Sequence, residues 1–342
     1  MKKTKDRFWS LLRNFFTVYL PKQRGCSEHT ISACHKTWNL LLLYLNSEKK
    51  IDYEQMTIEL FDATLINEFL DYMESKRNWK ISTRNQRLSC IRIFFNYVAM
   101  TDSTLYSCVS NLQSIPKKKD VNKSMIVEFI PEDAITTLLS IPNSSHRLGM
   151  RDQFFLSLMY DTAARDSEML QMKRADLNME MSSVYLLGKG NKPRLVPISK
   201  ETLVMAKKYC EIFHVNDKEA PMFYTTHRGY KTPMSDDNVA RFLKKYADMA
   251  RVSNPHVPER IYPHIIRKSR AMHLYRSGMP LALLAEFLGH ADPQTTLIYA
   301  YADTEMKRNA IEKAASRFSL PNNTEMVWKN DNDIIERLCR GY

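Results

Sequence analysis

Residues 182–198 read SSVYLLGKGNKPRLVPI, and this stretch decides between an all-helical and a mixed fold. Two segments, 184–187 and 194–198, are rich in β-branched and large apolar residues and flank the sequence GKGNKP. Such segments on either side of a glycine-containing turn are typical of a β-hairpin. We therefore expect a hairpin with lysines at its tip.

The chain before residue 113 has a different pattern, because its apolar residues recur every three or four positions. This spacing is typical of amphipathic helices. We expect Pro21 to end the first helix and Ser27 to cap the second. Four helices are predicted, over residues 8–20, 27–45, 62–76 and 82–97. They predict a small helical bundle over residues 1–113.

A charged, proline-containing segment follows the bundle and predicts a linker over residues 114–128. Helical periodicity then resumes, with the hairpin as its exception, so a second domain is expected over residues 129–320. Residues 321–342 are expected to be a tail with one short amphipathic segment. The predicted fold is mainly α with a small antiparallel β-sheet: a helical N-terminal domain followed by an α+β domain.

The charge balance points to a polyanionic partner. The chain of 342 residues has 50 Lys and Arg against 38 Asp and Glu, a net charge of +12. The excess is spread along the chain, with 20 basic and 13 acidic residues in the first 128. A distributed excess favours nucleic acid bound by both domains over a basic tail. No apolar run is long enough for a membrane span, and no secretion signal is recognisable, so we expect a cytoplasmic protein without membrane contact.

The six cysteines are scattered along the sequence. They form no CxxC pair, and no histidines stand at the spacing of a zinc finger. Neither a disulfide scaffold nor a structural zinc site is expected.

Four sequence segments occur in a fixed order in the second half of the chain: YDTAARDSEML at 160–170, GKGNKPR at 188–194, HIIR at 264–267, and LGH at 288–290 followed nine residues later by Tyr299. In this order and at these spacings they resemble the tyrosine recombinase (phage integrase) family, most closely its Xer-like branch. The resemblance covers residues 130–310 well, and the N-terminal bundle is similar in kind to the core-binding domain of that family.

The residue types also suggest a chemistry by themselves. A phosphodiester under attack gains negative charge on its non-bridging oxygens, and guanidinium groups such as those of Arg165 and Arg267 can bind these oxygens. His290 can donate a further hydrogen bond, and Tyr299 can supply a phenolic nucleophile. A phenol with a pKa near 10 needs cationic neighbours and a base, for which His264 is the candidate. No metal or cofactor is required, because the arginines supply the positive charge.

Two assignments have rivals nearby. Lys189 is the candidate general acid for the leaving 5′-oxygen, and Lys192 in the same turn is its rival and a candidate phosphate contact. Asp292 and Pro293 predict the start of a helix that carries Tyr299. Tyr301 on that helix would lie about 200° around its axis from Tyr299, at 3.6 residues per turn.

The resemblance implies a reaction and a set of partners. Attack by the tyrosine would form a 3′-phosphotyrosyl bond that a 5′-hydroxyl later reverses, so strands are exchanged through a Holliday junction. The implied partners are double-stranded DNA sites and further copies of the chain, as a tetramer on DNA, and a monomer free of DNA is compatible with the sequence. The tail is expected to dock on a neighbouring protomer, although packing on its own protomer remains open. Lesser candidates for DNA contact are Lys192, Arg194, Lys268, Arg84 and Arg87.

Several alternatives stay open at this stage. A cleavage-inactive DNA-binding protein of the same fold, or a type IB topoisomerase, would share much of the pattern, and neither the target site nor the biological role can be deduced. Arg165 could be an ion-pair partner of Asp161 or Glu168 on a helix surface. His290 could serve only as a helix cap after Gly289.

The sequence also departs from the usual family pattern. It has Thr162-Ala163-Ala164 where a Thr-Gly pair is common, and Lys268, Arg270 and His273 where other residues are usual. These differences put substrate contacts in doubt, but they remove none of the candidate catalytic groups.

Overall fold

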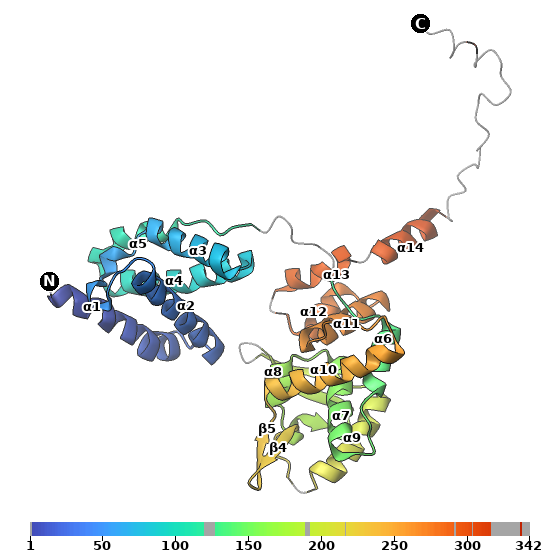
Figure 1. Ribbon diagram of the computed structural model, residues 1–342. Helices are drawn as coiled ribbons and strands as arrows, with labels where there is room; N and C mark the ends of the chain where they lie inside the picture. The colour runs from blue at the N-terminus through green and yellow to red at the C-terminus, as the bar shows by residue number, and fades with distance from the viewer. Residues whose placement is uncertain are drawn as a thin grey trace. The chain divides into compact units, whose positions relative to one another are not determined.

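The computed structural model divides into two compact units, residues 1–123 and 124–342 (Figure 1). It describes residues 2–119, 127–188, 192–215, 217–290, 292–302, 304–315 and Glu336. The expected tail at 321–342, apart from Glu336, therefore lies outside the described residues. In the part that is described, no helix combines the length and the apolar character needed to cross a membrane.

The N-terminal unit is entirely helical in its described part, as predicted. Its elements are α1 (Lys2–Asn14), η1 (Phe15–Gln23), α2 (Glu28–Ser47), η2 (Tyr53–Gln55), η3 (Ile58–Leu60), α3 (Ala63–Arg77), α4 (Ile81–Thr101), η4 (Ser103–Leu105) and α5 (Tyr106–Gln113). Ser27 caps α2 as expected, because its side chain accepts a hydrogen bond from the backbone N–H of Thr30.

Two details of this unit differ from the prediction. Pro21 does not end the first helix, because the chain continues as a π-helix to Gln23 with Pro21 inside it. The wider π turn relaxes the usual i to i−4 pairing that proline disrupts. In addition, α5 is a fifth α-helix, whose short eight-residue span was not recognised in the sequence.

The core of the N-terminal unit is aromatic. Phe8, Trp38, Phe61, Phe94 and Phe95 are each at most 1% exposed. The rings of Trp38 and Phe94 meet edge to face, with centroids 4.5 Å apart. Such pairs add to the burial of their large apolar area, so the bundle has a well-defined core.

The C-terminal unit combines helices with two small antiparallel sheets, and the predicted fold class is confirmed. Its helices are α6 (Glu132–Ser140), α7 (Arg147–Thr162), α8 (Asp166–Gln171), η5 (Arg174–Asp176), α9 (Lys200–Phe213), α10 (Asp236–Ser253), α11 (Pro263–Arg276), α12 (Leu281–Leu288), η6 (Pro293–Thr296), α13 (Leu297–Ala302) and α14 (Thr304–Ala315). Its strands are β1 (Leu177–Asn178), β2 (Ser183–Gly188), β3 (Lys192–Pro197), β4 (Tyr224–His227) and β5 (Tyr230–Pro233).

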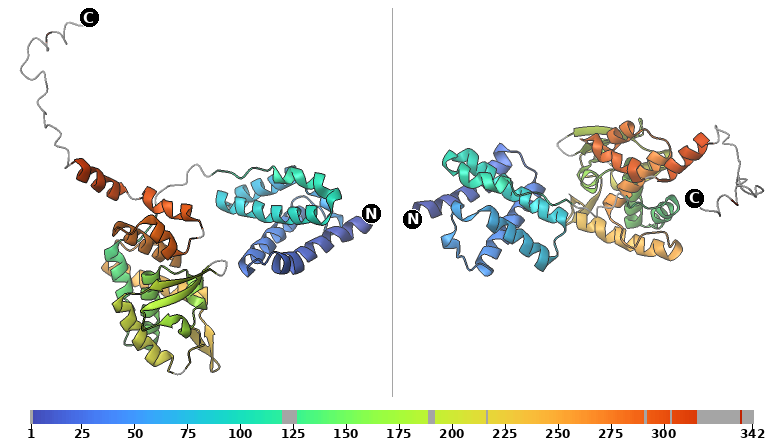
Figure 2. Two further views of the ribbon diagram at one scale, coloured as in Figure 1. Left: turned by 180° about the vertical axis from the view of Figure 1, so that it is seen from behind. Right: turned by 90° about the horizontal axis from the view of Figure 1, so that it is seen from above.

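The predicted hairpin is present as β2 and β3, which run side by side (Figure 2). Val184 pairs with Val196, and Gly188 pairs with Lys192 at the end next to the turn. The short strand β1 extends this sheet on the other side of β2.

A second hairpin, β4 paired with β5, was missed at the sequence level, where 182–198 was the one segment expected to form strands. Its turn places Arg228 and Gly229 at positive φ angles of 49° and 84°. The Arg-Gly turn and the neighbouring threonines were signals of a hairpin, but four-residue strands give too short an alternation to detect.

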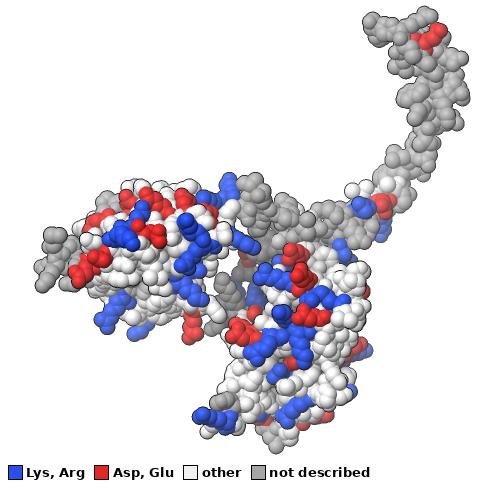
Figure 3. All heavy atoms as spheres, in the orientation of Figure 1, with Lys and Arg blue, Asp and Glu red and all other residues white. Residues whose placement is uncertain are grey.

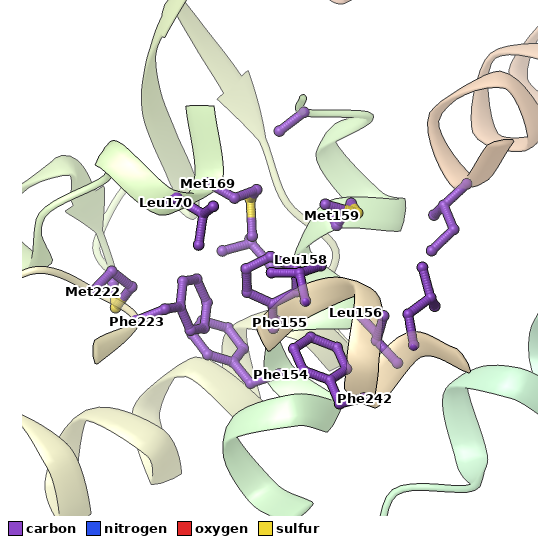
Figure 4. Packing of buried hydrophobic residues seen from close by; sticks show 14 of the residues in the cluster. Phe154, Phe155, Leu156, Leu158, Met159, Met169, Leu170, Met222, Phe223 and Phe242 are labelled. Carbon is purple, nitrogen blue, oxygen red and sulfur yellow. The ribbon is translucent and has the colours of Figure 1, made fainter. Parts of the chain in front are cut away.

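Several phenylalanine rings pack among leucine and methionine side chains in the core of the C-terminal unit (Figure 4). Phe154 and Phe155 of α7 pack against Phe223, and Phe155 also packs against Phe242 of α10. Neighbouring residues of α7 are buried as well, including Leu156, Leu158 and Met159. The helix is therefore central to the unit, and its C-terminal end is held firmly beside α8 and α11.

Candidate active site

Four segments far apart in the sequence converge in the C-terminal unit. They are the end of α7 with the loop to α8, the first turns of α11, the end of α12, and α13. A small apolar cluster joins them, in which Ala163, Met272, Leu288 and Tyr299 are buried together. Of the predicted site residues, Tyr299 belongs to this cluster and Arg267 donates hydrogen bonds to the carbonyl oxygens of two of its members, Ala163 and Leu288.

Arg267 connects two of these segments. Its side chain is buried, with 1% of the residue exposed. One terminal nitrogen donates to the carbonyl oxygen of Ala163 at 2.6 Å and the other to that of Leu288 at 2.5 Å. Burial and the nearby charge of Arg165 lower its pKa to about 10. Both acceptors are neutral carbonyl groups, while the nearby carboxylate of Glu168 favours the charged form of the guanidinium.

Ala163 has the backbone conformation that glycine adopts most readily. It ends α7 in the left-handed region, with φ of 48° and ψ of 31°. This is the position where the family pattern commonly has glycine. The departure therefore strains the backbone by about 1–2 kcal/mol, while the carbonyl group that Arg267 uses is kept.

Arg165 lies at the start of α8 and is paired with Glu168. Its guanidinium donates to Oε1 of Glu168 at 2.6 Å, and its backbone N–H donates to Oε2 at 2.9 Å. The local ion pair considered as an alternative is thus real. The Arg165 side chain is still 29% exposed, against 3% for that of Glu168, so part of the guanidinium faces solvent beside Arg267.

His290 follows the C-terminal cap of α12. Gly289 adopts a φ of 62°, and the backbone N–H of His290 donates to the carbonyl of Ala285, so the capping alternative is also real. The side chain has a separate partner, because Nδ1 lies 2.8 Å from Oγ1 of Thr296. Burial, followed by the charges of Arg267 and Arg165, lowers the pKa of His290 to about 4. The imidazole is therefore neutral at ordinary pH.

His264 lies in the first turn of α11, three residues before Arg267. It is exposed, whereas Arg267 and Tyr299 are buried. Partial burial and the charges of Lys268, Arg267 and Arg165 lower its pKa. A neutral imidazole at neutral pH is the form that can accept a proton.

The structure separates the two candidate tyrosines. Tyr299 is 5% exposed, whereas Tyr301 is 57% exposed. Burial raises the pKa of Tyr299, while the charge of Arg267 acts to lower it. Asp292 accepts from the backbone N–H of Gln294 with Pro293 at the first helical position, so the predicted cap is confirmed, although its first turn is the 3-10 helix η6.

Lys189 lies outside the described residues. Its rival Lys192 begins β3 and is exposed. Lys268 on α11 is partly exposed.

Three arginines expected to contact DNA have partners within the protein. Arg84 is 3% exposed and pairs with Glu74, with Nε 3.4 Å from Oε2. Arg87 donates to the Ala33 carbonyl at 3.0 Å. Arg194 has a side chain 9% exposed and is engaged with Glu168. Arg84 and the Arg194 side chain are buried in these pairs and Arg87 is half-buried, while contact of these residues with DNA stays a prediction.

The two unusual residues of α11 form a network with the end of α7. His273 Nδ1 lies 2.8 Å from the hydroxyl of Tyr160, and Arg270 donates to the Asp161 carboxylate at 3.2 Å. Asp161 also accepts from the backbone N–H of Ser199 at 2.6 Å. These contacts join α11 to the end of α7 and to the start of α9, so the two unusual residues Arg270 and His273 have a structural role.

The visible surface of each unit carries mixed charge. Figure 3 shows Lys and Arg side chains interspersed with Asp and Glu on this face. An open groove of about 700 Å³ lies between β3 and α12, and Lys192, Arg194 and His290 are among the residues that line it. Positive charge therefore lies next to the cluster of site residues.

Three residues had roles that sequence reasoning missed. Glu168 was considered only as an ion-pair partner, Thr296 only as a helix residue and Arg194 only as a DNA contact. The spacing of Arg165 and Glu168 at i and i+3 had already suggested their ion pair, but not the pairing of Glu168 with Arg194. The contacts of Thr296 and Arg194 depend on folding, so no local pattern could have found them.

Tyr299 is thus buried within reach of the charge of Arg267, on a framework of helices and a β-hairpin. The chain belongs to the phage integrase family. The family model "Phage integrase family" matches residues 128–306, and the model "Phage integrase, N-terminal SAM-like domain" matches residues 4–100. The predicted resemblance to tyrosine recombinases is confirmed.

Named relatives of this chain agree with the family assignment. The Sinorhizobium fredii protein y4rC, whose name places it among integrases and recombinases, is 30% identical over 307 residues, covering 89% of this chain and 91% of the relative. The tyrosine recombinase XerD of Haemophilus ducreyi is 29% identical over 235 residues, covering 68% of this chain and 75% of XerD.

Solved structures share the fold. The XerH site-specific recombinase bound to palindromic difH substrate matches with a TM-score of 0.66 and 20% identity, covering 86% of this chain and 81% of that one. The Tn1549 transposon integrase in complex with transposon right end DNA matches with a TM-score of 0.67 and 16% identity, covering 88% of this chain and 98% of that one.

Proposed function

We propose that this protein is a site-specific DNA recombinase that cuts and rejoins DNA through a 3′-phosphotyrosyl intermediate. The observation that carries the proposal is the convergence of Arg165, Arg267, His290 and Tyr299 around one apolar cluster. Solved relatives bound to DNA, and the net charge of +12, support DNA as the substrate. Strand exchange through a Holliday junction by a tetramer belongs to the same proposal.

In the proposed reaction the scissile phosphate lies between Arg165 and Arg267. Its non-bridging oxygens gain charge as the phenolic oxygen of Tyr299 attacks phosphorus, and the guanidiniums stabilise that charge. His264 accepts the phenolic proton, and the general acid, assigned to Lys189, gives a proton to the departing 5′-oxygen. The 5′-hydroxyl of a second strand then attacks the phosphotyrosyl bond and releases the tyrosine.

Thr296 supports the proposed role of His290. When the Thr296 hydroxyl donates to Nδ1, the proton of the neutral imidazole resides on Nε2. His290 can then donate a hydrogen bond to a phosphate oxygen without carrying a charge.

Replacing Thr296 with valine should slow cleavage about 10- to 100-fold, because a buried ring nitrogen without its partner costs about 1–3 kcal/mol. Thr296→Ser should keep most of the activity. The neighbouring Thr295→Val is the matched control, since Thr295 is exposed and bonds only to the Asp292 carbonyl in the contacts described. Single-turnover cleavage and thermal melting measure both effects. Equal cleavage rates for Thr296→Val and wild type would show that the Thr296 hydroxyl takes no part in the mechanism.

DNA affinity should fall steeply with salt. Two units with an excess of basic residues would displace counterions from several phosphates, with a slope of about 0.9 per phosphate in a plot of log affinity against log salt. Fluorescence anisotropy with a labelled duplex between low and moderate salt measures the slope. A flat response would contradict binding of the duplex by both units.

A nicked suicide substrate tests the proposed function directly. Cleavage next to the nick releases a short fragment, which traps a covalent protein–DNA adduct that a denaturing gel resolves. An adduct is expected with wild-type protein, whereas binding without an adduct would favour the cleavage-inactive alternative. Relaxation of supercoiled DNA lacking any recombination site would favour the topoisomerase alternative.

A further inference from the structure

Arg194 has the contacts of a residue that organises the site. It lies on β3, and its side chain is 9% exposed. Its two terminal nitrogens donate to the two carboxylate oxygens of Glu168, at 3.1 and 2.7 Å, and Nε donates to the carbonyl of Phe287 at 3.1 Å. One guanidinium thus joins the hairpin, α8 and the end of α12.

Two glycines leave room for this side chain. A Cβ atom at Gly289 would lie only 3.0 Å from a terminal nitrogen of Arg194. A Cβ atom at Gly188 would lie 3.4 Å from the same nitrogen and 3.6 Å from Oε1 of Glu168. Gly289 immediately precedes His290, so the guanidinium packs directly against the segment that carries the candidate histidine.

Glu168 shares its single negative charge between Arg194 and Arg165. Burial acts to raise the pKa of Glu168, but the hydrogen bonds from Arg194 and Arg165 outweigh it and lower the pKa. Arg194 therefore helps to keep the carboxylate ionised and fixes its plane through a bidentate pair. Oε1 of that carboxylate accepts from the Arg165 side chain, which it holds at 2.6 Å.

We propose that Arg194 is a positioning residue that acts through Glu168 to orient Arg165 toward the scissile phosphate. The inference rests on the proposed function, because it requires Arg165 to act on that phosphate. Lysine at position 194 would keep the charge but lose the planar fork, so it could not bind both carboxylate oxygens and the Phe287 carbonyl together.

The test compares Arg194→Gln and Arg194→Lys with wild type in single-turnover cleavage of the nicked substrate. Both variants should cleave about 10- to 100-fold more slowly, because displacing a catalytic group by about 1 Å can slow a reaction by such a factor. Their DNA affinity and its salt dependence should stay unchanged. Lys207→Gln, which removes an exposed charge on α9, controls for net charge.

A 5′-phosphorothiolate substrate distinguishes an effect of Arg194 on Arg165 from an effect on the general acid. Sulfur leaves without a proton, so it should not rescue the Arg194 variants if they misplace Arg165. Rescue by sulfur would place the effect on the general acid and overturn the proposal. If the Arg194 variants lowered the slope of log DNA affinity against log salt, Arg194 would instead be a DNA contact. Lys192→Gln should show such a lowered slope if Lys192 contacts a phosphate.

Glu168→Gln provides a second route if Arg194→Gln is poorly folded by thermal melting. The double variant Arg194→Gln/Glu168→Gln should cleave no more slowly than the slower of the two single variants, because both substitutions break the same contact between Arg194 and Glu168. Additive losses would overturn the proposal. If wild-type protein forms no adduct, the proposed function itself fails. If wild-type protein forms the adduct and both Arg194 variants match its rate, only this inference fails.

Discussion

Replacing Tyr299 with phenylalanine should abolish the covalent protein–DNA adduct while leaving DNA binding intact. The change removes one oxygen and little packing from a side chain that is 5% exposed. Without the phenolic oxygen, the phosphotyrosyl bond of the proposed mechanism cannot form. The nicked suicide substrate and a denaturing gel measure the adduct, and fluorescence anisotropy measures binding.

Tyr301→Phe is the matched control, because it makes the same chemical change two residues away on the same helix. Tyr301 is 57% exposed, and its variant should form the adduct at close to the wild-type rate. If Tyr299→Phe forms the adduct and Tyr301→Phe does not, the nucleophile is Tyr301 and the assignment is reversed.

Lys189→Ala should slow cleavage of an ordinary substrate about 100- to 10,000-fold, which is the usual contribution of a general acid. With a 5′-phosphorothiolate substrate the loss should nearly vanish, since the sulfur departs without a proton. The ratio of the two single-turnover rates isolates the proton-transfer step from any effect on binding or folding.

Arg165→Ala and Arg267→Ala are the controls for this experiment. Both should stay defective with either substrate, because charge develops on the non-bridging oxygens whichever atom leaves. Lys192→Ala distinguishes the two lysines of the turn. If sulfur rescues Lys192→Ala but not Lys189→Ala, the proton donor is Lys192.

The free energy of unfolding should also fall in acid. The pKa of His290 falls from 6.5 to about 4, and that of His264 is lowered as well. The unfolded chain therefore binds more protons than the folded chain between these values. The stabilisation from the neutral rings is complete above pH 6.5 and declines as the pH falls toward 4.

The amino-acid sequence by itself determined the features that depend on neighbours along the chain. Apolar periodicity predicted the helical bundle, the segments around GKGNKP predicted β2 and β3, and Asp292-Pro293 predicted the start of η6. These features are local, because helix stripes, turns and caps involve residues within a few positions of one another. The order of the four motifs was sufficient to recognise the family.

Only the tertiary structure decided which side chains have partners and which face the site. Arg194 and Arg165 both appear in the sequence as basic residues, and both bind Glu168 in the structure. The Arg194 side chain is 9% exposed and also donates to the Phe287 carbonyl, whereas the Arg165 side chain is 29% exposed. The pairing of His290 with Thr296 also depends on how the chain turns after α12. The physical reason is that contacts between distant segments, and the loss of water that strengthens them, arise only when the whole unit packs.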